Sequence, residues 1–298
     1  MRITIATFEG MPPHFGGDDR LLLEKLRERG AEVAYIPWTD EGTDWASPDL
    51  VVARSPWDYA LRHAEFIDWV RCVRAPLENA PGLIEWNSDK RYLADLGEDG
   101  VPVVETTYVA RGERPPAIDS QVVVKPTISA GARDTGRFGP ASAAAGRKLI
   151  ERICDRGGTA MVQPFIPTVE TSGETAVVMI AGEVSHVLHK SPVLEPDEVA
   201  PVREDELRVA ESMYDPDLVS PGRAEPGEIR LAEQTLAAID RRFGTTPLVA
   251  RVDMLAGLSG SPLLLELEAI EPNLYFNQTP AAADRLADAI ISRATQPR

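Results

Sequence analysis

The stretch Leu263-Leu264-Leu265-Glu266-Leu267-Glu268-Ala269-Ile270-Glu271-Pro272-Asn273 places acidic side chains inside a leucine-rich segment. In a β-strand every second side chain points to the same face, so Glu266 and Glu268 share a face, about 6–7 Å apart along the chain. Two like charges in so apolar a strand are costly unless a cation or oppositely charged partners compensate them. The stretch therefore predicts a strand whose acids face a cation.

A second apolar strand lies just upstream, Leu248-Val249-Ala250-Arg251-Val252-Asp253-Met254-Leu255, and in it Arg251 and Asp253 share a face. The glycine-flanked segment 257–260 between the two strands suits a hairpin turn. Such a hairpin brings three carboxylates and one guanidinium together. Carboxylates bind divalent metals and a guanidinium binds phosphate, so the hairpin predicts a metal site for a phosphorylated substrate. The alternative is a half-exposed sheet face with its acids in water.

The composition limits the classes of partner. The formal charge is −16, from 31 basic and 47 acidic residues, and nucleic-acid binding would need a basic stripe that the sequence lacks. Cys72 and Cys154 have no metal-like spacing. Residues 1–8 are typical of a first strand rather than of a signal peptide, and no apolar segment approaches the ~20 residues of a membrane span. We expect a soluble cytoplasmic protein that binds neither nucleic acid nor membrane.

Hydrophobic periodicity predicts an open α/β domain first and mixed α+β structure afterwards. In the first part we expect strands at 2–8, 33–36 and 50–53 and helices at 18–29 and 64–74. Beyond it we expect strands at 122–124, 160–163, 175–180 and 183–188, and helices at 88–96, 142–156 (capped by Ser142), 226–243 and a final one with Thr279 as cap and Pro280 first. Residues 191–224, rich in proline and acids, are expected to form a loop.

Lys90 and Lys125 stand at the ends of predicted elements, where a lysine can meet a phosphate as a point charge. The glycine-punctuated stretch 129–139 follows, and its backbone N–H groups can fold over an anion. It matches neither a Walker P-loop nor G-x-G-x-x-G. Taken singly, such a lysine is more often an ordinary surface residue, and a flexible hairpin is the alternative for the loop.

Two other segments suit small-molecule binding. Residues 161–167 form a strand that runs into a proline-flanked extended linker, whose free backbone groups can recognise the edge of an adenine; a simple turn is the alternative. Arg54, Trp57 and Asp58 follow the strand at 50–53, at an edge where α/β sheets bind ligands. A surface Arg–Asp pair is the alternative there. Lys190, at the end of another strand, adds a cation.

Taken in order, these motifs resemble those of the ATP-grasp superfamily of ATP-dependent carboxylate ligases. The resemblance implies a fold with α/β and α+β parts: a preATP-grasp α/β domain at 1–80, and two α+β subdomains, 81–165 and 166–298, that clamp ATP. The motifs are Lys90, Val122-Val123-Val124-Lys125-Pro126, the 129–139 loop, Gln163-Pro164-Phe165-Ile166, Gly173-Glu174, Arg251-Val252-Asp253 and Glu266-Leu267-Glu268 through Asn273.

The resemblance also implies roles for individual residues. Asp253, Glu266 and Glu268 would hold Mg²⁺, with Mn²⁺ able to substitute, and catalysis would fall to Arg251 and Lys125. Many members have Glu-x-Asn where this chain has Glu266-Leu267-Glu268, which leaves open whether Glu268 binds metal directly. The ATP-binding residues would be Lys90, Lys125, Ser129, Gly131, Gln163, Phe165, Ile166 and Glu170, and the substrate-binding residues Arg54, Trp57, Asp58, Lys190 and Asn273.

Three segments, 54–59, 86–90 and 266–272, are similar to those of the actinobacterial group that includes the O-ureido-serine cyclo-ligase of D-cycloserine biosynthesis. This similarity implies an antibiotic-biosynthesis ligase that activates the carboxylate of an amino-acid-like substrate as an acyl phosphate and then closes a ring through a C–N bond. The alternatives are an intermolecular amino-acid or dipeptide ligase and an inactive ATP-binding regulatory protein. The oligomeric state stays open, a homodimer included.

Overall fold

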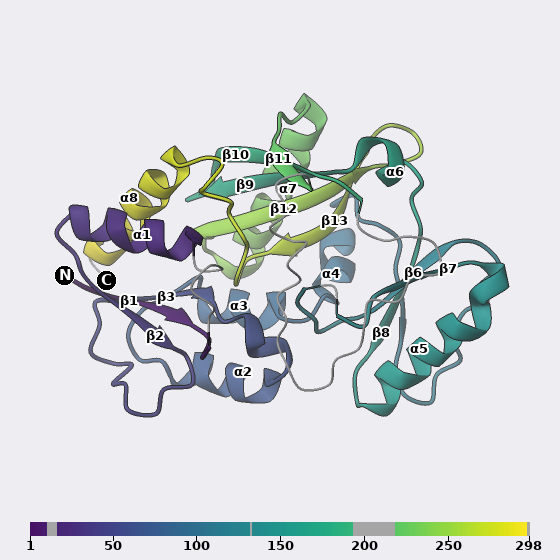
Figure 1. Ribbon diagram of the computed structural model, residues 1–298, viewed down its shortest axis with the longest axis horizontal. Coiled ribbons are helices and arrows are strands. Elements are labelled where there is room, and N and C mark those ends of the chain that lie inside the picture. Colours follow the sequence, from purple (N-terminus) through teal and green to yellow (C-terminus); the bar gives the residue numbers. More distant parts are fainter. Residues whose placement is uncertain (11–16, 132, 193–217, 297–298) are drawn as a thin grey trace.

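The computed structural model describes residues 1–10, 17–131, 133–192 and 218–296. Most of the loop expected at 191–224 lies outside these ranges. The described chain forms three sheets, and in the sequence the strands of the third, as numbered below, come between those of the first and the second. The first sheet and helix α8 (Ala281–Thr295) lie at one end of the molecule. The sheet that packs against helix α5 (Ala143–Asp155) lies at the other end (Figure 1).

The first sheet is parallel and has the order β2-β1-β3-β4. Its central strand β3 is buried along its whole length, because helices cover both faces. Leu50 and Val52 pack with helix α1, and Val51 and Ala53 pack with helix α2. Its elements are β1 (Arg2–Thr7), α1 (Gly17–Glu28), β2 (Glu32–Pro37), β3 (Leu50–Ser55), the 3₁₀ helix η1 (Trp57–Ala60), α2 (His63–Cys72) and β4 (Leu77–Glu78).

The second sheet is antiparallel and contains the predicted hairpin. Strands β12 and β13 pair with Arg251 opposite Glu268 and Asp253 opposite Glu266, so these four side chains share a face as predicted. The strand order is β11-β10-β9-β12-β13. The strands are β9 (Glu174–Ile180), β10 (Glu183–Lys190), β11 (Val219–Pro221), β12 (Val249–Ala256) and β13 (Pro262–Glu268).

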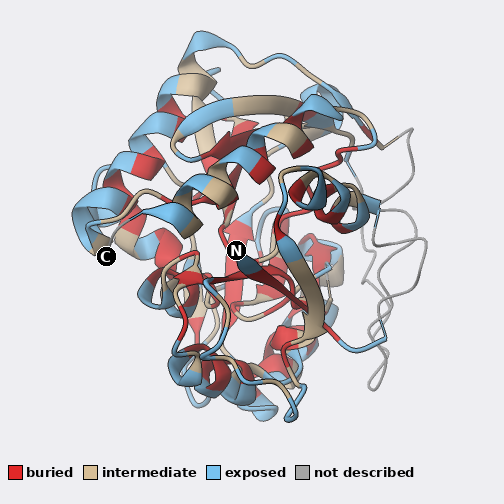
Figure 2. Ribbon diagram, turned by 90° about the vertical axis from the view of Figure 1, so that its left-hand side faces the viewer, coloured by how far each residue is buried: buried red, intermediate tan, exposed pale blue. Residues whose placement is uncertain are grey.

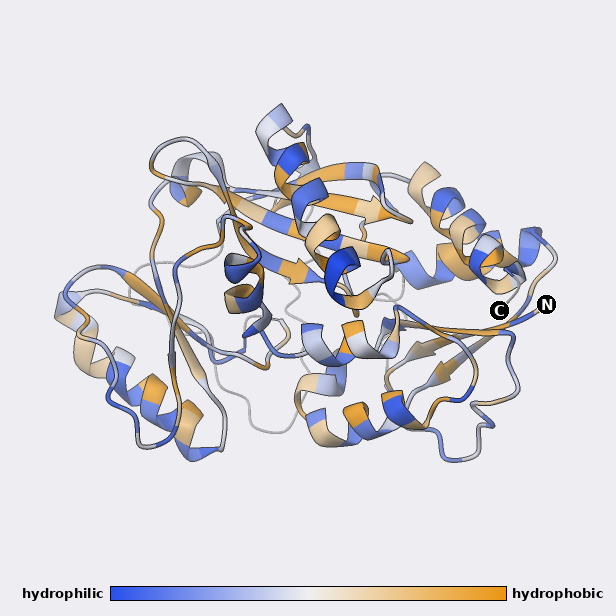
Figure 3. Ribbon diagram, turned by 180° about the vertical axis from the view of Figure 1, so that it is seen from behind, coloured by the Kyte–Doolittle hydropathy of each residue, from blue (hydrophilic) through white to orange (hydrophobic). Residues whose placement is uncertain are grey.

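The two faces of this sheet are covered differently. On one face, Val177, Met179 and Val252 pack with helices α3 (Pro81–Asn87), α4 (Tyr92–Glu98) and α7 (Pro226–Phe243). On the other face, Val178 and Ile180 pack with helix α8 (Ala281–Thr295) and with α1. Inner strands such as β3, β9 and β12 are mostly buried, whereas β2 and β10 are partly exposed, and helices expose their outer sides (Figure 2). The alternation of the helices also appears in their hydropathy (Figure 3). The part of the second face that α8 does not cover carries the charged residues.

The third sheet has the order β5-β8-β6-β7. Val122 and Val124 pack against helix α5, so the intervening Val123 and the following Lys125 point to the opposite face. Gln163 pairs with Val123 and shares that face. The elements are β5 (Thr107–Val109), β6 (Val122–Pro126), β7 (Gly136–Phe138), the 3₁₀ helix η2 (Pro140–Ser142), α5 (Ala143–Asp155), β8 (Ala160–Pro164) and the short α6 (Val169–Ser172).

Several local predictions were wrong. The helix expected at 88–96 is replaced by α3 and α4, which are separated by a turn that contains Lys90. Ser142 occupies the N-cap position of α5 as expected, but its hydroxyl makes no capping hydrogen bond to that helix and accepts one from the Gly139 N–H of η2. Thr279 donates to the Tyr275 carbonyl instead of capping α8. The last residues of the 129–139 loop form β7. The domain boundaries at 80 and 165 stay a prediction.

In the described ranges, no helix is long and apolar enough to cross a bilayer.

Candidate active site

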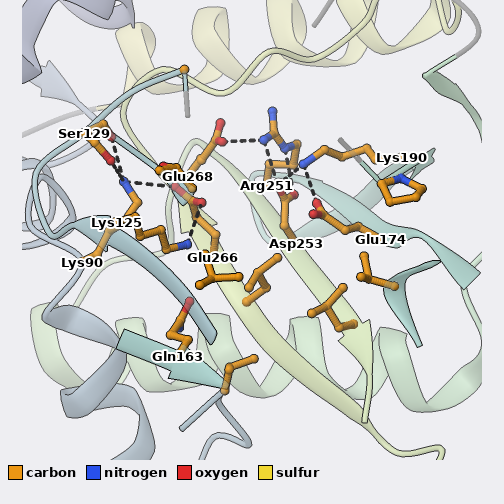
Figure 4. Close-up of a pocket in the computed structure, with 18 of the residues that line it drawn as sticks. Lys90, Lys125, Ser129, Gln163, Glu174, Lys190, Arg251, Asp253, Glu266 and Glu268 are labelled. Atoms are coloured by element: carbon orange, nitrogen blue, oxygen red, sulfur yellow. Dashed lines mark hydrogen bonds and ion pairs between the residues drawn. The ribbon is translucent and has the colours of Figure 1, made fainter. Parts of the chain in front are cut away.

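A pocket of about 330 Å³ lies between the second and third sheets, a size typical of small-molecule sites. Four neighbouring strands of the second sheet contribute charged side chains to it: Lys190 from β10, Glu174 from β9, Arg251 and Asp253 from β12, and Glu266 and Glu268 from β13. Lys125 and Gln163 line it from the third sheet. Figure 4 shows these side chains converging on one space.

Arg251 occupies the middle of the charged surface and is only 3% exposed. Its Nε and Nη2 donate to the two carboxylate oxygens of Asp253, each at 2.8 Å, and Nη2 also pairs with Glu268. Nη1 donates to the Asn273 carbonyl at 3.0 Å. A guanidinium fixed by a bidentate pair and a carbonyl is held in one orientation, as an electrostatic catalyst requires.

Lys190 extends this network to the neighbouring strands. Its ammonium donates to Glu174 at 2.7 Å and to Asp253 at 3.0 Å. Burial alone would raise the pKa of Asp253, but Arg251 and Lys190 outweigh it and lower that pKa. Asp253 therefore stays ionised.

Glu266 faces the two lysines that the sequence analysis singled out. Lys90 Nζ lies 3.3 Å and Lys125 Nζ 4.0 Å from its carboxylate oxygens. Burial would raise the pKa of Glu266, but these lysines lower it, whereas burial lowers the pKa of Lys125. Lys90 also donates to the Ser129 carbonyl at 2.7 Å, which ties the turn after α3 to the glycine-rich loop.

The negative charges of Glu268 and Glu271 are not fully balanced by nearby cations. Burial raises the pKa of Glu268 to about 7 and, together with the charge of Glu268, raises that of Glu271 to about 8. Excess negative charge of this kind favours an added cation. Within the described ranges, no three acidic, histidine or cysteine side chains form a ready-made metal cage. Mg²⁺ usually takes only one or two protein carboxylates and completes its shell with phosphate oxygens and water, so the donor set fits a metal that arrives with a nucleotide.

The segment after β8 lines the pocket next to Gln163. Gln163 is buried and donates to Thr106 at 2.9 Å. The Phe165 N–H already donates to the Gln121 carbonyl at 2.9 Å, so only the Phe165 carbonyl and Ile166 are left there for a base edge. The Phe165 ring lies under the Arg137 guanidinium at 3.5 Å.

Glu170 lies outside the residues that line the pocket. Its carboxylate pairs with Arg137 at 2.6 Å. The predicted ribose contact by Glu170 therefore gains no support from its position.

Arg54 and Asp58 are not among the residues that line the pocket, so their predicted substrate contacts gain no support from their positions and stay predictions. Arg54 is 1% exposed and donates to the Pro272 carbonyl at 2.7 Å. It also pairs with Asp18 at 3.5 Å and Asp19 at 3.2 Å. Asp58 accepts a hydrogen bond from the Trp38 indole at 2.7 Å.

The remaining predicted residues do reach the pocket. Trp57 and Asn273 line it together with Lys190, and so do Ser129 and Gly131 of the glycine-rich loop; Ala132 lies outside the described residues.

Two acids in the pocket were given no role in the sequence analysis. Glu174 and Glu271 both line it. Glu174 begins β9, opposite Lys190, and only strand pairing reveals this neighbour. Glu271 continues the acidic series of the opening stretch, three residues after Glu268, and that spacing was the available signal.

Known proteins have a similar sequence or share the fold. Residues 3–79 match the family model described as "D-cycloserine synthetase DcsG, N-terminal domain". The chain is 34% identical over 288 residues to the cycloserine biosynthesis protein DcsG of Streptomyces lavendulae. The alignment covers 91% of this chain and 92% of that protein.

Among solved structures, the crystal structure of D-cycloserine synthetase DcsG superposes with a TM-score of 0.86 at 32% identity, over 99% of this chain and all of that one. D-alanine–D-alanine ligase from Bacillus anthracis in complex with ATP shares the fold, with a TM-score of 0.64 at 12% identity over 99% and 97% of the two chains.

The fold and these relatives define the class of this protein as an ATP-grasp carbon–nitrogen ligase. Within that class, the chain belongs to the family of the cycloserine biosynthesis protein DcsG. The predicted superfamily, fold class and enzyme type are thereby confirmed, and an inactive regulatory protein is not supported.

Proposed function

We propose that this ligase uses ATP to activate the carboxylate of an O-ureido-serine-like substrate and then closes the ring of cycloserine within the same molecule. The observation that carries the proposal is the pocket itself, in which two lysines face Glu266 at one side and the fixed Arg251 guanidinium lies between Asp253 and Glu268. The similarity to proteins named for cycloserine synthesis supports the product.

In the first step a substrate carboxylate oxygen bonds to the γ-phosphorus of ATP, and the bond from that phosphorus to the bridging oxygen of ADP breaks. Lys90 and Lys125 would bind phosphate oxygens, a role supported by the burial of both side chains at the pocket wall. The Phe165 carbonyl and Ile166 would hold the adenine. When bound, Mg²⁺ held by Asp253, Glu266 and Glu268 would neutralise phosphate charge.

In the second step a nitrogen of the same substrate attacks the acyl carbon. The C–N bond forms, the nitrogen loses a proton, and inorganic phosphate leaves. Arg251 would stabilise the oxyanion of the tetrahedral intermediate, since its orientation is fixed before the reaction. Conversion of the ureido compound to cycloserine also removes the carbamoyl group, by hydrolysis to carbon dioxide and ammonia. Intramolecular attack is favoured by proximity.

An intermolecular amino-acid ligase is the alternative function, because it would use the same activation step. The two differ in the number of substrates that turnover needs. Purified protein with ATP and Mg²⁺ is therefore incubated with O-ureido-serine alone, with single amino acids, and with pairs of amino acids. ADP is measured and products are identified by mass spectrometry.

We expect ADP and cycloserine from the single ureido substrate, no ADP in the presence of a chelator, and recovery of activity with Mn²⁺. ADP release that requires two amino acids, together with a dipeptide product, would contradict ring closure and establish the alternative. Arg251→Lys serves as the matched variant, since it keeps the charge but loses the bidentate pair with Asp253.

A further inference from the structure

Glu271 differs from the other acids of the pocket in its partners. Five acidic side chains line the pocket, and within the described ranges Glu271 is the one without an ion pair to lysine or arginine. Glu174 and Asp253 pair with Lys190, Glu266 with Lys90, and Glu268 with Arg251. A cation that binds in the pocket would therefore find at Glu271 a carboxylate that no protein cation already holds.

The surroundings of Glu271 fix its position without neutralising it. The buried Tyr59 side chain lies close to its carboxylate, and the Trp57 indole donates to its carbonyl at 3.2 Å. Burial, followed by the charge of Glu268, raises the pKa of the Glu271 carboxyl. A positive ligand group placed beside it would relieve the cost of that buried charge.

Asn273, two residues further along, offers the complementary group. It lines the pocket at 7% exposure, and its side-chain amide nitrogen has no hydrogen-bond partner among the residues that the structure describes. Its carbonyl accepts from Arg251 at 3.0 Å, so the residue is fixed next to the guanidinium. A buried donor without an acceptor is costly, and a substrate oxygen can remove that cost.

We propose that Glu271 binds the ammonium group of an α-amino-acid substrate, while the carboxyl oxygens of that substrate lie toward Asn273 and Arg251. The inference rests on the proposed function, since it assigns the orientation of the substrate that is activated. An α-amino acid carries both groups on one carbon, and residues 271 and 273 are about 6–7 Å apart along an extended chain, so one small molecule can meet both. Glu271 thus selects substrates with a free α-ammonium group.

The test compares two ligands that differ only in that group, O-ureido-serine and its analogue with hydrogen in place of the α-amino group. Each is titrated calorimetrically into protein saturated with Mg²⁺ and a non-hydrolysable ATP analogue. The variant is Glu271→Gln, which keeps the size and the polarity of the side chain but removes the charge. Glu85→Gln, an exposed acid of α3 paired with Arg71, is the matched control.

We expect wild type and Glu85→Gln to bind the α-amino compound about 10- to 100-fold more tightly than the analogue, the range for a hydrogen bond to a charged group. Glu271→Gln should abolish that preference and leave binding of the ATP analogue unchanged. Equal weakening of both ligands, a changed Mg²⁺ requirement for both, or no preference in wild type would overturn the inference.

The same measurement separates this inference from the proposed function. A preference that depends on Glu271, without cycloserine formation in the turnover assay, would leave the ammonium subsite standing and remove the ring closure. Cycloserine formation without such a preference would do the reverse.

Discussion

At the scale of single residues, the site combines buried cations with five acids, four of which have a defined cationic partner. Arg251 is satisfied by Asp253, Glu268 and a carbonyl. Lys125 is less well paired, because its Glu266 partner is 4.0 Å away and burial lowers its pKa. A buried ammonium with so distant a partner gains most from an arriving phosphate.

Lys125→Ala should therefore lower kcat/KM for ATP. The expected decrease corresponds to a loss of roughly 2–4 kcal/mol of transition-state stabilisation, as for the loss of one oriented donor. Steady-state kinetics with varied ATP measure this change, and Lys148→Ala on the exposed side of α5 provides the control. Unchanged ATP kinetics in Lys125→Ala would remove this lysine from the phosphate site.

The sequence predicted these residues better than it predicted Arg54. Arg251, Asp253, Glu266 and Glu268 follow from strand alternation within one local hairpin. Arg54 instead depends on contacts between α1 and the segment after β13, which are distant in sequence. No local pattern encodes these long-range contacts. The sequence therefore predicted that Arg54 binds the substrate, with a surface Arg–Asp pair as the alternative.

At the scale of elements, the segment 272–276 is clamped by the first sheet and its helix. One carboxylate, that of Asp18 in α1, accepts the N–H groups of Leu274, Tyr275 and Phe276 at 2.7–2.8 Å. Arg54, at the end of β3, holds the Pro272 carbonyl. Because this segment carries Asn273, whose carbonyl holds Arg251, the α/β unit fixes part of the site from outside the pocket.

Arg54→Lys should accordingly raise the KM for the amino-acid substrate and lower kcat, while the affinity for ATP stays nearly unchanged. Lysine keeps the charge but cannot reach the Asp18, Asp19 and Pro272 partners together. Kinetics with each substrate varied in turn provide the measurement, and Arg71→Lys at an exposed pair is the control. A rise in the KM for ATP alone would show that Arg54 serves the nucleotide side instead.

His186 on β10 also holds this segment, through a hydrogen bond from its Nε2 to the Leu274 carbonyl at 2.8 Å. Burial lowers its pKa from 6.5 to about 4. Below pH 6.5 this histidine takes up a proton in the unfolded chain but stays neutral in the folded chain. The contribution of His186 to the free energy of unfolding is therefore complete above pH 6.5 and declines as the pH falls toward 4.

We expect the free energy of unfolding to drop between pH 7 and pH 5, and His186→Gln to show a smaller drop over the same interval. Denaturant titrations at several pH values measure both proteins. Parallel pH profiles would mean that other groups cause the loss.

Local patterns predicted most elements but not the breaks between them. The helix 226–243 and the hairpin strands have long, regular patterns and short turns, and the structure confirms them. The segment 81–98 has apolar residues with helical spacing on both sides of Lys90. Its division into two helices follows from tertiary contacts, since the Lys90 N–H donates to the Thr127 carbonyl in the third-sheet region.

At the scale of the whole molecule, the pocket belongs to no single sheet. The third sheet supplies Lys125, the second supplies Arg251 and its acids, and η1 of the first unit supplies Trp57. The order of the motifs along the chain predicted this architecture. The contribution of each unit to one pocket could not be predicted in detail, because it depends on how the three sheets pack.

A nucleotide that binds between the second and third sheets should stabilise the whole molecule against unfolding. At a concentration of 100 times its Kd, a non-hydrolysable ATP analogue with Mg²⁺ adds about 2.7 kcal/mol, because it binds the folded state and not the unfolded chain. Thermal unfolding followed by circular dichroism should show a single transition that moves to higher temperature as the analogue concentration increases. At the same analogue concentration Lys125→Ala should give a smaller shift, since it removes a phosphate contact supplied by the third sheet, whereas Lys148→Ala should match wild type. A shift confined to one of two separate transitions would show that the nucleotide binds one unit alone and does not bridge the sheets.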